Sequence, residues 1–362
     1  MLDDLRKPHP TRYFADAGAS ATLGWCCFAL VLSAVPLPLR ALAFVIACFS
    51  LYRALAFIHE LFHQQTLKRF RIFWHAVAGV PLLLPLLLYM PVHQVHHNAR
   101  TYGTEADGEY EHFGGREHTM VVKLLALNLL IPFALLVRFG LLTPLSALFP
   151  VIRHKVIPAF LHLSLRMPYT APEISKRFRH ESALVEVACM VFAWSLVGSA
   201  VIWSVQILLA WSGLLIVIAT LNTIRAACAT HLYQESDTGR DSFAQVEDST
   251  NIDGGRFLTG LLCPAGLEYH ALHHLVPYLP YHSLPQAHAR LLAHVPEDAP
   301  YRQSTVSTLA QGWQRVVRPD SAASKPASAL AGPIPGESVS AARQPVLPPS
   351  AAPARKEPVD AA

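Results

Sequence analysis

Charged residues are scarce in this chain. Asp, Glu, Lys and Arg make up 15% of its 362 residues, whereas a typical soluble domain has roughly 25%. Hydrophobic residues reach 52% and the mean hydropathy is +0.31. This composition favours an integral membrane protein over an ordinary soluble domain. The net charge of +4 is small and no basic patch alternates with aromatic residues, so the sequence argues against a nucleic-acid partner.

Cysteine is also rare. The six cysteines lie almost entirely in apolar stretches and none forms a CxxC pair, so we expect them to be small buried hydrophobic side chains. None follows Cys263, so the C-terminal segment cannot house an iron–sulfur cluster. The N-terminus has no small-residue cleavage site after a short apolar core, and a cleaved signal peptide is not expected.

Histidine, by contrast, recurs in a fixed spacing. Residues 93–97 read HQVHH, which places three imidazoles at i, i+3 and i+4 on one helix face. The same spacing returns at residues 270–274 (HALHH), and residues 59–63 (HELFH) carry two histidines at i and i+4. A lone histidine is usually a core or surface residue, but one spacing used three times in an apolar chain predicts a metal site. Imidazole suits Zn, Cu, Fe and Ni, and the rings can converge on one point or on two points a few ångströms apart.

Four apolar runs are each close to the ~20 residues that span a bilayer. These runs predict an all-α integral membrane protein with four transmembrane helices in two hairpins. The second hairpin is expected to turn near residues 211–213. A cytosolic helical cap is expected to carry the histidine boxes. Lys and Arg just after the second run mark that side as cytosolic. The runs are 19–36, 41–58, 184–209 and 214–230.

Two further apolar segments are predicted not to cross the membrane singly. If residues 72–92 crossed, His93 would emerge opposite His59, so we expect this segment to be interfacial or re-entrant. Residues 121–150 are expected to be interfacial or a hairpin that returns. The acid- and aromatic-rich residues 98–113 are predicted to form a loop over the site.

The chain divides into three parts by composition. Residues 1–18 are predicted to be a polar cytosolic segment, and residues 19–318 the membrane domain. Residues 319–362 hold nine prolines among Ala and Ser and are predicted to be a disordered tail. Residues 151–180 are basic, which favours a solvated face beside anionic lipid, with docking of an acidic partner as the alternative.

The boxes resemble those of the membrane fatty acid desaturase and hydroxylase superfamily. HALHHLVPYLPYHSLPQAH is similar to the third box of its bacterial acyl-lipid desaturase branch, and residues 248–252 (DSTNI) resemble the segment before that box. The likeness covers roughly residues 40 to 295. It implies a cytosolic di-iron centre with a further histidine after the last transmembrane helix. The implied ligands are His59, His63, His93, His96, His97, His231, His270, His273 and His274.

The resemblance implies an O2-dependent oxidoreductase that introduces a double bond into a fatty acyl chain, in the bacterial inner membrane, with two Fe ions as cofactor and O2 as co-substrate. The HPGG motif of a fused cytochrome b5-like domain is absent, because Thr11 follows His9-Pro10. Electrons must then come from an external ferredoxin, rubredoxin-like protein or cytochrome. The chain departs from the superfamily at two places. Some members carry Asn at the position of Ala227, and many carry Asn or Gln shortly before the third box, where this chain has Gly266 and Glu268.

Several residues near the boxes are candidates for supporting roles. Carboxylates that could orient ligand rings are Glu60, Glu109, Glu111 and Glu268. Aromatic residues that could shape a substrate channel are Tyr89, Tyr102, Tyr110 and Tyr269. Histidines expected not to be ligands are His112, His118, His282 and His288.

Two other functions compete with desaturation. Hydroxylation or ketolation of a lipid, a carotenoid or another apolar molecule uses the same ligands and differs in how the intermediate is aimed. The other is an intramembrane zinc protease, because residues 59–63 match HExxH with Glu60 as general base and residues 251–255 (NIDGG) resemble a distant ligand element. The protease leaves both HxxHH boxes unexplained.

Overall fold

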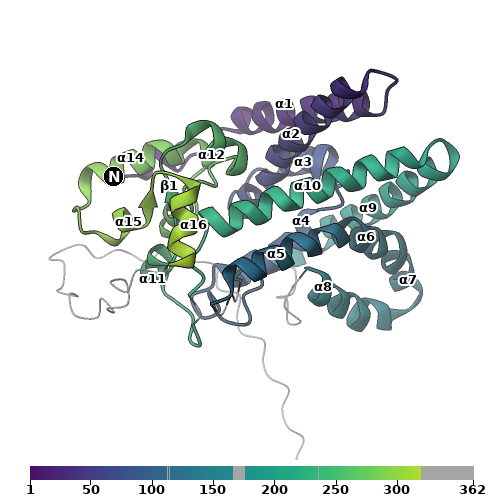
Figure 1. Ribbon diagram of the computed structural model, residues 1–362. Coiled ribbons are helices and arrows are strands. Elements are labelled where there is room, and N and C mark those ends of the chain that lie inside the picture. The colour runs from purple at the N-terminus through teal and green to yellow at the C-terminus, as the bar shows by residue number, and fades with distance from the viewer. Residues whose placement is uncertain (112, 114, 166–175, 235, 319–362) are drawn as a thin grey trace, which may run out of the picture. The chain divides into compact units, whose positions relative to one another are not determined.

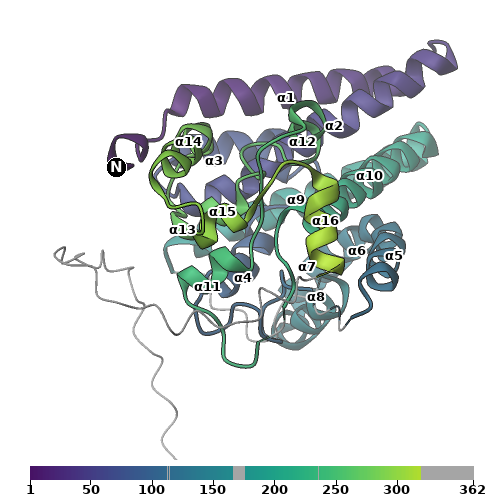
Figure 2. The same cartoon turned by 60° about the vertical axis from the view of Figure 1, so that its left-hand side comes forward.

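Two long helix pairs dominate the computed structural model, which describes residues 1–111, 113, 115–165, 176–234 and 236–318. Helix α1 (Pro10–Val31) packs along α2 (Leu37–His63), and α9 (Lys176–Ile202) pairs with α10 (Val205–Ala229) (Figures 1 and 2). Residues 1–319 form one compact unit. The predicted disordered tail lies outside the described residues.

The second pair turns at a different place from the prediction. The connection lies at residues 203–204, where the Ser204 side chain accepts from the Gln206 backbone N–H and caps α10. The expected turn at residues 211–213 is wrong, because this stretch lies inside α10. Trp211 is buried there and donates its indole N–H to the Pro81 carbonyl at 2.8 Å. A Cβ on Gly213 would lie 3.4 Å from the Phe44 ring, so this glycine allows close packing of α10 on α2.

Five helical segments are long and apolar enough to cross a membrane, where the sequence predicted four. Four of them are the two helix pairs, although α1 begins at Pro10, inside the segment predicted to be polar. The fifth is Glu117–Leu148. Large apolar side chains such as Val201 and Trp203 are more than three-quarters exposed on the described surface, as expected for lipid contact.

The fifth segment is broken rather than continuous. It consists of α5 (Glu117–Leu127), the 3-10 turn η3 (Asn128–Leu130), α6 (Ile131–Leu136), the π-helical turn η4 (Val137–Leu142) and α7 (Thr143–Leu148). The chain runs beside α10, turns at α7 and comes back through η5 (Ile152–Val156) and α8 (Ile157–Leu165) (Figure 1).

The position of His231 supports a returning segment. The structure places His231 beside His96, so the chain between them crosses any membrane an even number of times. If α9 and α10 each cross once, Glu117–Leu148 cannot add a single crossing without a return. The number of true spans stays a prediction.

Shorter elements build the cap. After α2 come α3 (Lys68–Trp74) and the π-helical turn η2 (His75–Gly79), and a non-helical stretch containing Pro81 and Pro85 then precedes α4 (Leu86–His96), as expected for a segment that does not span singly. The remaining elements are η1 (Asp3–Leu5), α11 (Ser242–Glu247), α12 (Arg256–Leu262), α13 (His270–Leu275), η6 (Tyr281–Ser283), α14 (Leu284–His294), α15 (Pro300–Gln303) and α16 (Leu309–Val317).

One small sheet is the exception to helical structure in the described residues. Strand β1 (Asn251–Ile252) pairs in parallel with β2 (Thr305–Val306), with Asn251 opposite Thr305. The Asn251 side-chain oxygen accepts from the Leu272 backbone N–H at 3.1 Å. The sheet therefore fixes α13, which carries the third histidine box, against the C-terminal part of the cap.

Candidate metal centre

The ends of three helices meet at the histidine boxes. His63 is the last residue of α2, His96 is the last residue of α4, and His231 follows the end of α10 by two residues. The C-terminal end of a helix carries partial negative charge, which favours a cation nearby. Helix α13 supplies the third box from the opposite side. Four separate elements thus direct imidazoles to one place.

All nine histidines predicted as ligands come together, in two groups. Within each group the nearest ring nitrogens all lie within 4.8 Å of one another, which is close enough for one ion to bind them. Group one contains His59, His63, His93, His97 and His273, and group two contains His96, His231, His270 and His274.

Helix geometry explains how each HxxHH box divides. The i and i+4 rings of the second box, His93 and His97, belong to group one, and its i+3 ring, His96, belongs to group two. In the third box the assignment is reversed, so that His270 and His274 belong to group two. Residues i+3 and i+4 lie ~100° apart around a helix, so a single box reaches two neighbouring points.

The Nε2 atoms face one another inside each group. They lie 2.9 Å apart between His63 and His93 and 3.0 Å apart between His231 and His270. The buried Nε2 of His59 has no hydrogen-bond partner among the described residues. Two nitrogens that each present a lone pair cannot satisfy each other unless a proton or a metal ion lies between them. The crowded and unsatisfied Nε2 atoms therefore fit two metal ions.

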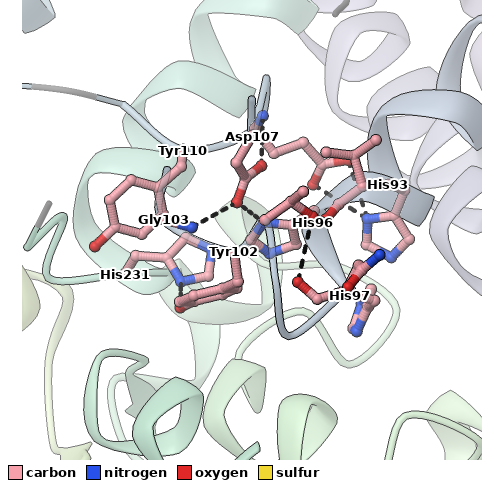
Figure 3. A network of polar contacts seen from close by, with 12 residues as sticks. His93, His96, His97, Tyr102, Gly103, Asp107, Tyr110 and His231 are labelled. Carbon is pink, nitrogen blue, oxygen red and sulfur yellow. Dashed lines mark hydrogen bonds and ion pairs between the residues drawn. The ribbon is translucent and has the colours of Figure 1, made fainter. Parts of the chain in front are cut away.

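The outer nitrogens of the second box bind carboxylates of the loop after α4. His96 Nδ1 lies 2.8 Å from Asp107 Oδ2, and His93 Nδ1 lies 3.0 Å from Glu109 Oε1. Asp107 also accepts from the Gly103 backbone N–H at 3.1 Å, so its carboxylate lies between the ring and the backbone (Figure 3). The predicted loop over the site is thus confirmed. Glu109 was expected as an orienting group, whereas sequence reasoning missed Asp107.

The outer nitrogens of His231 and His274 in group two have partners, whereas the buried Nδ1 of His270 has none among the described residues. His231 Nδ1 lies 2.8 Å from the Tyr102 hydroxyl, which donates to Asp248 at 3.0 Å, and Tyr110 donates to the same carboxylate oxygen at 2.7 Å. His274 Nδ1 lies 3.0 Å from Gln245 Oε1. Tyr102 and Tyr110 therefore support the ligands. The resemblance singled out residues 248–252, but the roles of Asp248 and Gln245 were missed.

Two other carboxylates predicted to orient ligands act differently. Glu60 accepts from the Tyr13 hydroxyl at 2.6 Å and from the Tyr281 backbone N–H at 3.1 Å, so it fastens α1 and η6 to α2. Its expected role beside a ligand ring is wrong, because its carboxylate is bonded to Tyr13 and Tyr281 instead. A zinc protease would need this carboxylate at the metal. Glu268 Oε2 is buried without a described partner.

Burial sets the protonation of most of these rings. It lowers the pKa of His93, His97 and His231 well below the usual value, so these imidazoles stay neutral and keep a lone pair for a metal. Burial also acts to lower the pKa of His96, but the Asp107 carboxylate outweighs it and the pKa is raised. Burial raises the pKa of Glu109 to about 7.

A cavity of about 420 Å³ meets both histidine groups. Its lining includes His59 and His93 of group one and His231 and His270 of group two. Away from the histidines its walls are mainly apolar and come from α2, α4, α5 and α10. This size and lining are typical of a small-molecule site.

The predicted non-ligand histidines lie elsewhere. His118 contacts Trp313, with ring centroids 5.2 Å apart, and His288 Nδ1 lies 2.6 Å from the Tyr301 hydroxyl. His282 Nε2 accepts from the His9 backbone N–H at 3.1 Å. His112 lies outside the described residues.

The helical frame, the paired histidine groups and the apolar cavity define a membrane oxidoreductase of the histidine-box class. Residues 35–305 match the model of the fatty acid desaturase family, and the chain belongs to this family. It is 32% identical over 311 residues to a ceramide hydroxylase from Caulobacter vibrioides (strain NA1000 / CB15N). The aligned residues cover 84% of this chain and 88% of that protein. The predicted superfamily and the expectation of an oxidoreductase are confirmed.

Proposed function

We propose that this protein is an O2-dependent hydroxylase of a long-chain membrane lipid, with a ceramide as the substrate class. The observation that carries the proposal is the apolar cavity that ends at both histidine groups. An apolar chain in this cavity would present a C–H bond to the place where the Nε2 atoms converge. The similarity to a ceramide hydroxylase over most of the chain favours hydroxylation and this substrate.

We further propose that the nine histidines hold two iron ions, five in group one and four in group two. Buried neutral imidazoles are a suitable donor set for iron. When bound, the iron supplies the O2 activation that an unactivated C–H bond requires. Asp107 and Glu109 would hold ring orientation through Nδ1 and leave Nε2 directed inward, and Gln245 would do so for His274. The apolar walls would exclude water and aim the chain.

Desaturation is the second candidate, favoured by the family to which the chain belongs. Both reactions begin with removal of a hydrogen, and they differ in whether oxygen is then added to the carbon or a second hydrogen is lost. To distinguish the two reactions, the wild-type protein is expressed in a host that contains ceramides and both saturated and unsaturated acyl lipids. The products are then identified by lipid mass spectrometry. A product that gains one oxygen supports hydroxylation, and a product that loses two hydrogens contradicts it. A His97→Ala variant serves as the inactive control.

We also propose an inner-membrane location with the histidine groups on the cytosolic side, where an external ferredoxin, rubredoxin-like protein or cytochrome supplies electrons. Lys68 and Arg69 lie shortly after the end of α2, which supports this orientation. A periplasmic reporter fused after Tyr89 should be inactive and a cytosolic reporter there active. The opposite pattern would contradict the orientation.

A further inference from the structure

An arginine in a helix long enough to span a membrane lines the central cavity. Arg225 belongs to α10, and its side chain forms part of the cavity wall together with Asn222 and Thr223. We call Asn222, Thr223 and Arg225 the polar strip. The rest of the lining on this stretch of α10 is apolar, including Ile218, and charged groups inside a span are costly and generally have a function.

Arg225 has no ion-pair partner among the described residues, although its charge acts on the Glu109 carboxylate across the cavity. The described residues put no carboxylate within ion-pair distance of its guanidinium. Its Nε and Nη2 donate to the Asn222 side-chain oxygen at 3.2 and 3.1 Å, and the group also interacts with the Tyr52 hydroxyl. Glu109, on another wall of the cavity, is bound to His93 instead. The guanidinium therefore retains positive charge and donor capacity in an apolar surround.

Extension of the side chain toward the membrane surface (snorkelling) does not account for the direction in which the Arg225 guanidinium points. An arginine near the end of a span usually extends toward the nearer interface, which here is the end of α10 that leads to His231. The bonds to Asn222 direct the guanidinium the other way, one turn toward the start of α10. Asn222 is exposed and lines the cavity, so the polar strip is accessible to a molecule in the cavity.

The strip divides the length of the cavity. At ~1.5 Å per helical residue, Arg225 lies ~9 Å along the chain direction of α10 from His231. The lining continues for a similar length beyond the strip, to Leu215. On α2, Tyr52 and His59 are both in the lining and stand ~10 Å apart by the same rise. Arg225 on α10 and Tyr52 on α2, which interact with each other, therefore stand at similar distances along their helices from the histidines.

We propose that the polar strip is a binding subsite for the oxygen-bearing end of the lipid, with Arg225 donating to its acceptor oxygens. The substrate would enter sideways beside Asn222, place its polar end at the strip, and present a carbon within ~10 Å of that end to the histidine groups. A second hydrocarbon chain would follow the apolar wall toward Leu215. Arg225 is a specificity-determining residue, and oxidation occurs near the polar end of the lipid. This inference rests on the proposed function for the reaction itself.

A binding measurement separates the inference from the reaction. Purified protein in nanodiscs is titrated with a short-chain ceramide, a free fatty acid and an alkane of equal chain length. Wild type should prefer the oxygen-bearing lipids over the alkane. In Arg225→Met this preference should fall by at least about tenfold, because one hydrogen bond to a charged group is lost. The iron content of this variant should be unchanged. Arg225→Lys should retain part of it. The control Lys123→Met removes an exposed charge of α5 outside the cavity lining and should bind as wild type does.

Each outcome decides one point. Preference for the ceramide over the fatty acid identifies neutral amide and hydroxyl oxygens as the ligand, and the reverse identifies a carboxylate. Equal binding of alkane and oxygen-bearing lipids by wild type, or an unchanged preference in Arg225→Met, overturns the subsite. A preference that depends on Arg225 without any oxidised product leaves the subsite in place and contradicts the proposed reaction. Where product forms, its oxygen should lie near the polar end.

Discussion

The His96 imidazole and the Asp107 carboxylate form a pair that is closed off from solvent. Nδ1 lies 2.8 Å from Oδ2 and both side chains are 0% exposed. The pair therefore ties the loop after α4 to group two, and removing the carboxylate leaves the buried His96 Nδ1 without its partner.

Replacing Asp107 with Asn should weaken metal binding. The amide retains the shape but loses the charge that fixes the His96 ring, and changes of this kind typically cost ~10–100-fold in metal affinity. Iron per chain, measured after dialysis against graded chelator, should fall at lower chelator concentration than for wild type. Glu105→Gln, an exposed position in the same loop, is the control. Equal retention of iron in Asp107→Asn and wild type would show that the pair only supports the fold.

Replacing His231 with Ala should remove activity and lower bound iron. His231 is one of only four rings in group two, and it comes from a helix end that contributes no other ligand. We expect loss of about one of the two ions and loss of turnover, as for His97→Ala. His282→Ala should keep its iron, because that ring lies outside both groups. Full iron and full turnover in His231→Ala would remove His231 from the ligand set.

Replacing Ala219 with Phe should shorten the accepted substrate. Ala219 lines the half of the cavity that lies beyond the polar strip, and a phenyl ring there would block it. Turnover of long-chain lipids should fall by about tenfold or more while short chains are kept, because a hydrophobic pocket discriminates by size on this scale. Ala210→Phe, on the same helix outside the cavity lining, is the control. A chain-length profile unchanged from wild type would mean that the substrate does not occupy this half.

Deleting residues 319–362 should leave activity and iron content unchanged. This segment carries no histidine and no apolar periodicity. The measurement is turnover per chain at matched expression in membranes. A truncated protein that is well expressed yet inactive would assign the tail a role that its composition does not indicate.

The nine histidines were predictable because ligand spacing on a helix is a local property. The i, i+3 and i+4 pattern marks eight of them, and the superfamily resemblance adds His231. Their division into five and four required the structure, since it depends on how α13 faces α4. Asp107, Asp248 and Gln245 were missed for a related reason. Asp107 and Gln245 contact imidazole rings directly and Asp248 acts through Tyr102, and these contacts form only in the tertiary fold. A single carboxylate in a polar loop also has no periodicity.

The errors in the predicted fold also have physical causes. Residues 211–213 combine serine and glycine, which often end helices. Here packing against α2 and the Trp211 bond to Pro81 keep α10 continuous. The two-residue strands β1 and β2 are too short for an alternating pattern. Glu60 adjoins His59 in sequence, and only the tertiary structure shows that its carboxylate is bonded to Tyr13 and Tyr281.

The division of each HxxHH box between both groups has a consequence for assembly. Helices α4 and α13 each contribute to both ion sites, so neither site can be completed before both helices are in register. Filling one site would position the remaining rings of both boxes for the other, and uptake of the two ions should be cooperative. Bound ions would also cross-link α2, α4, α13 and the end of α10, which makes metal supply during synthesis a determinant of how much folded protein accumulates.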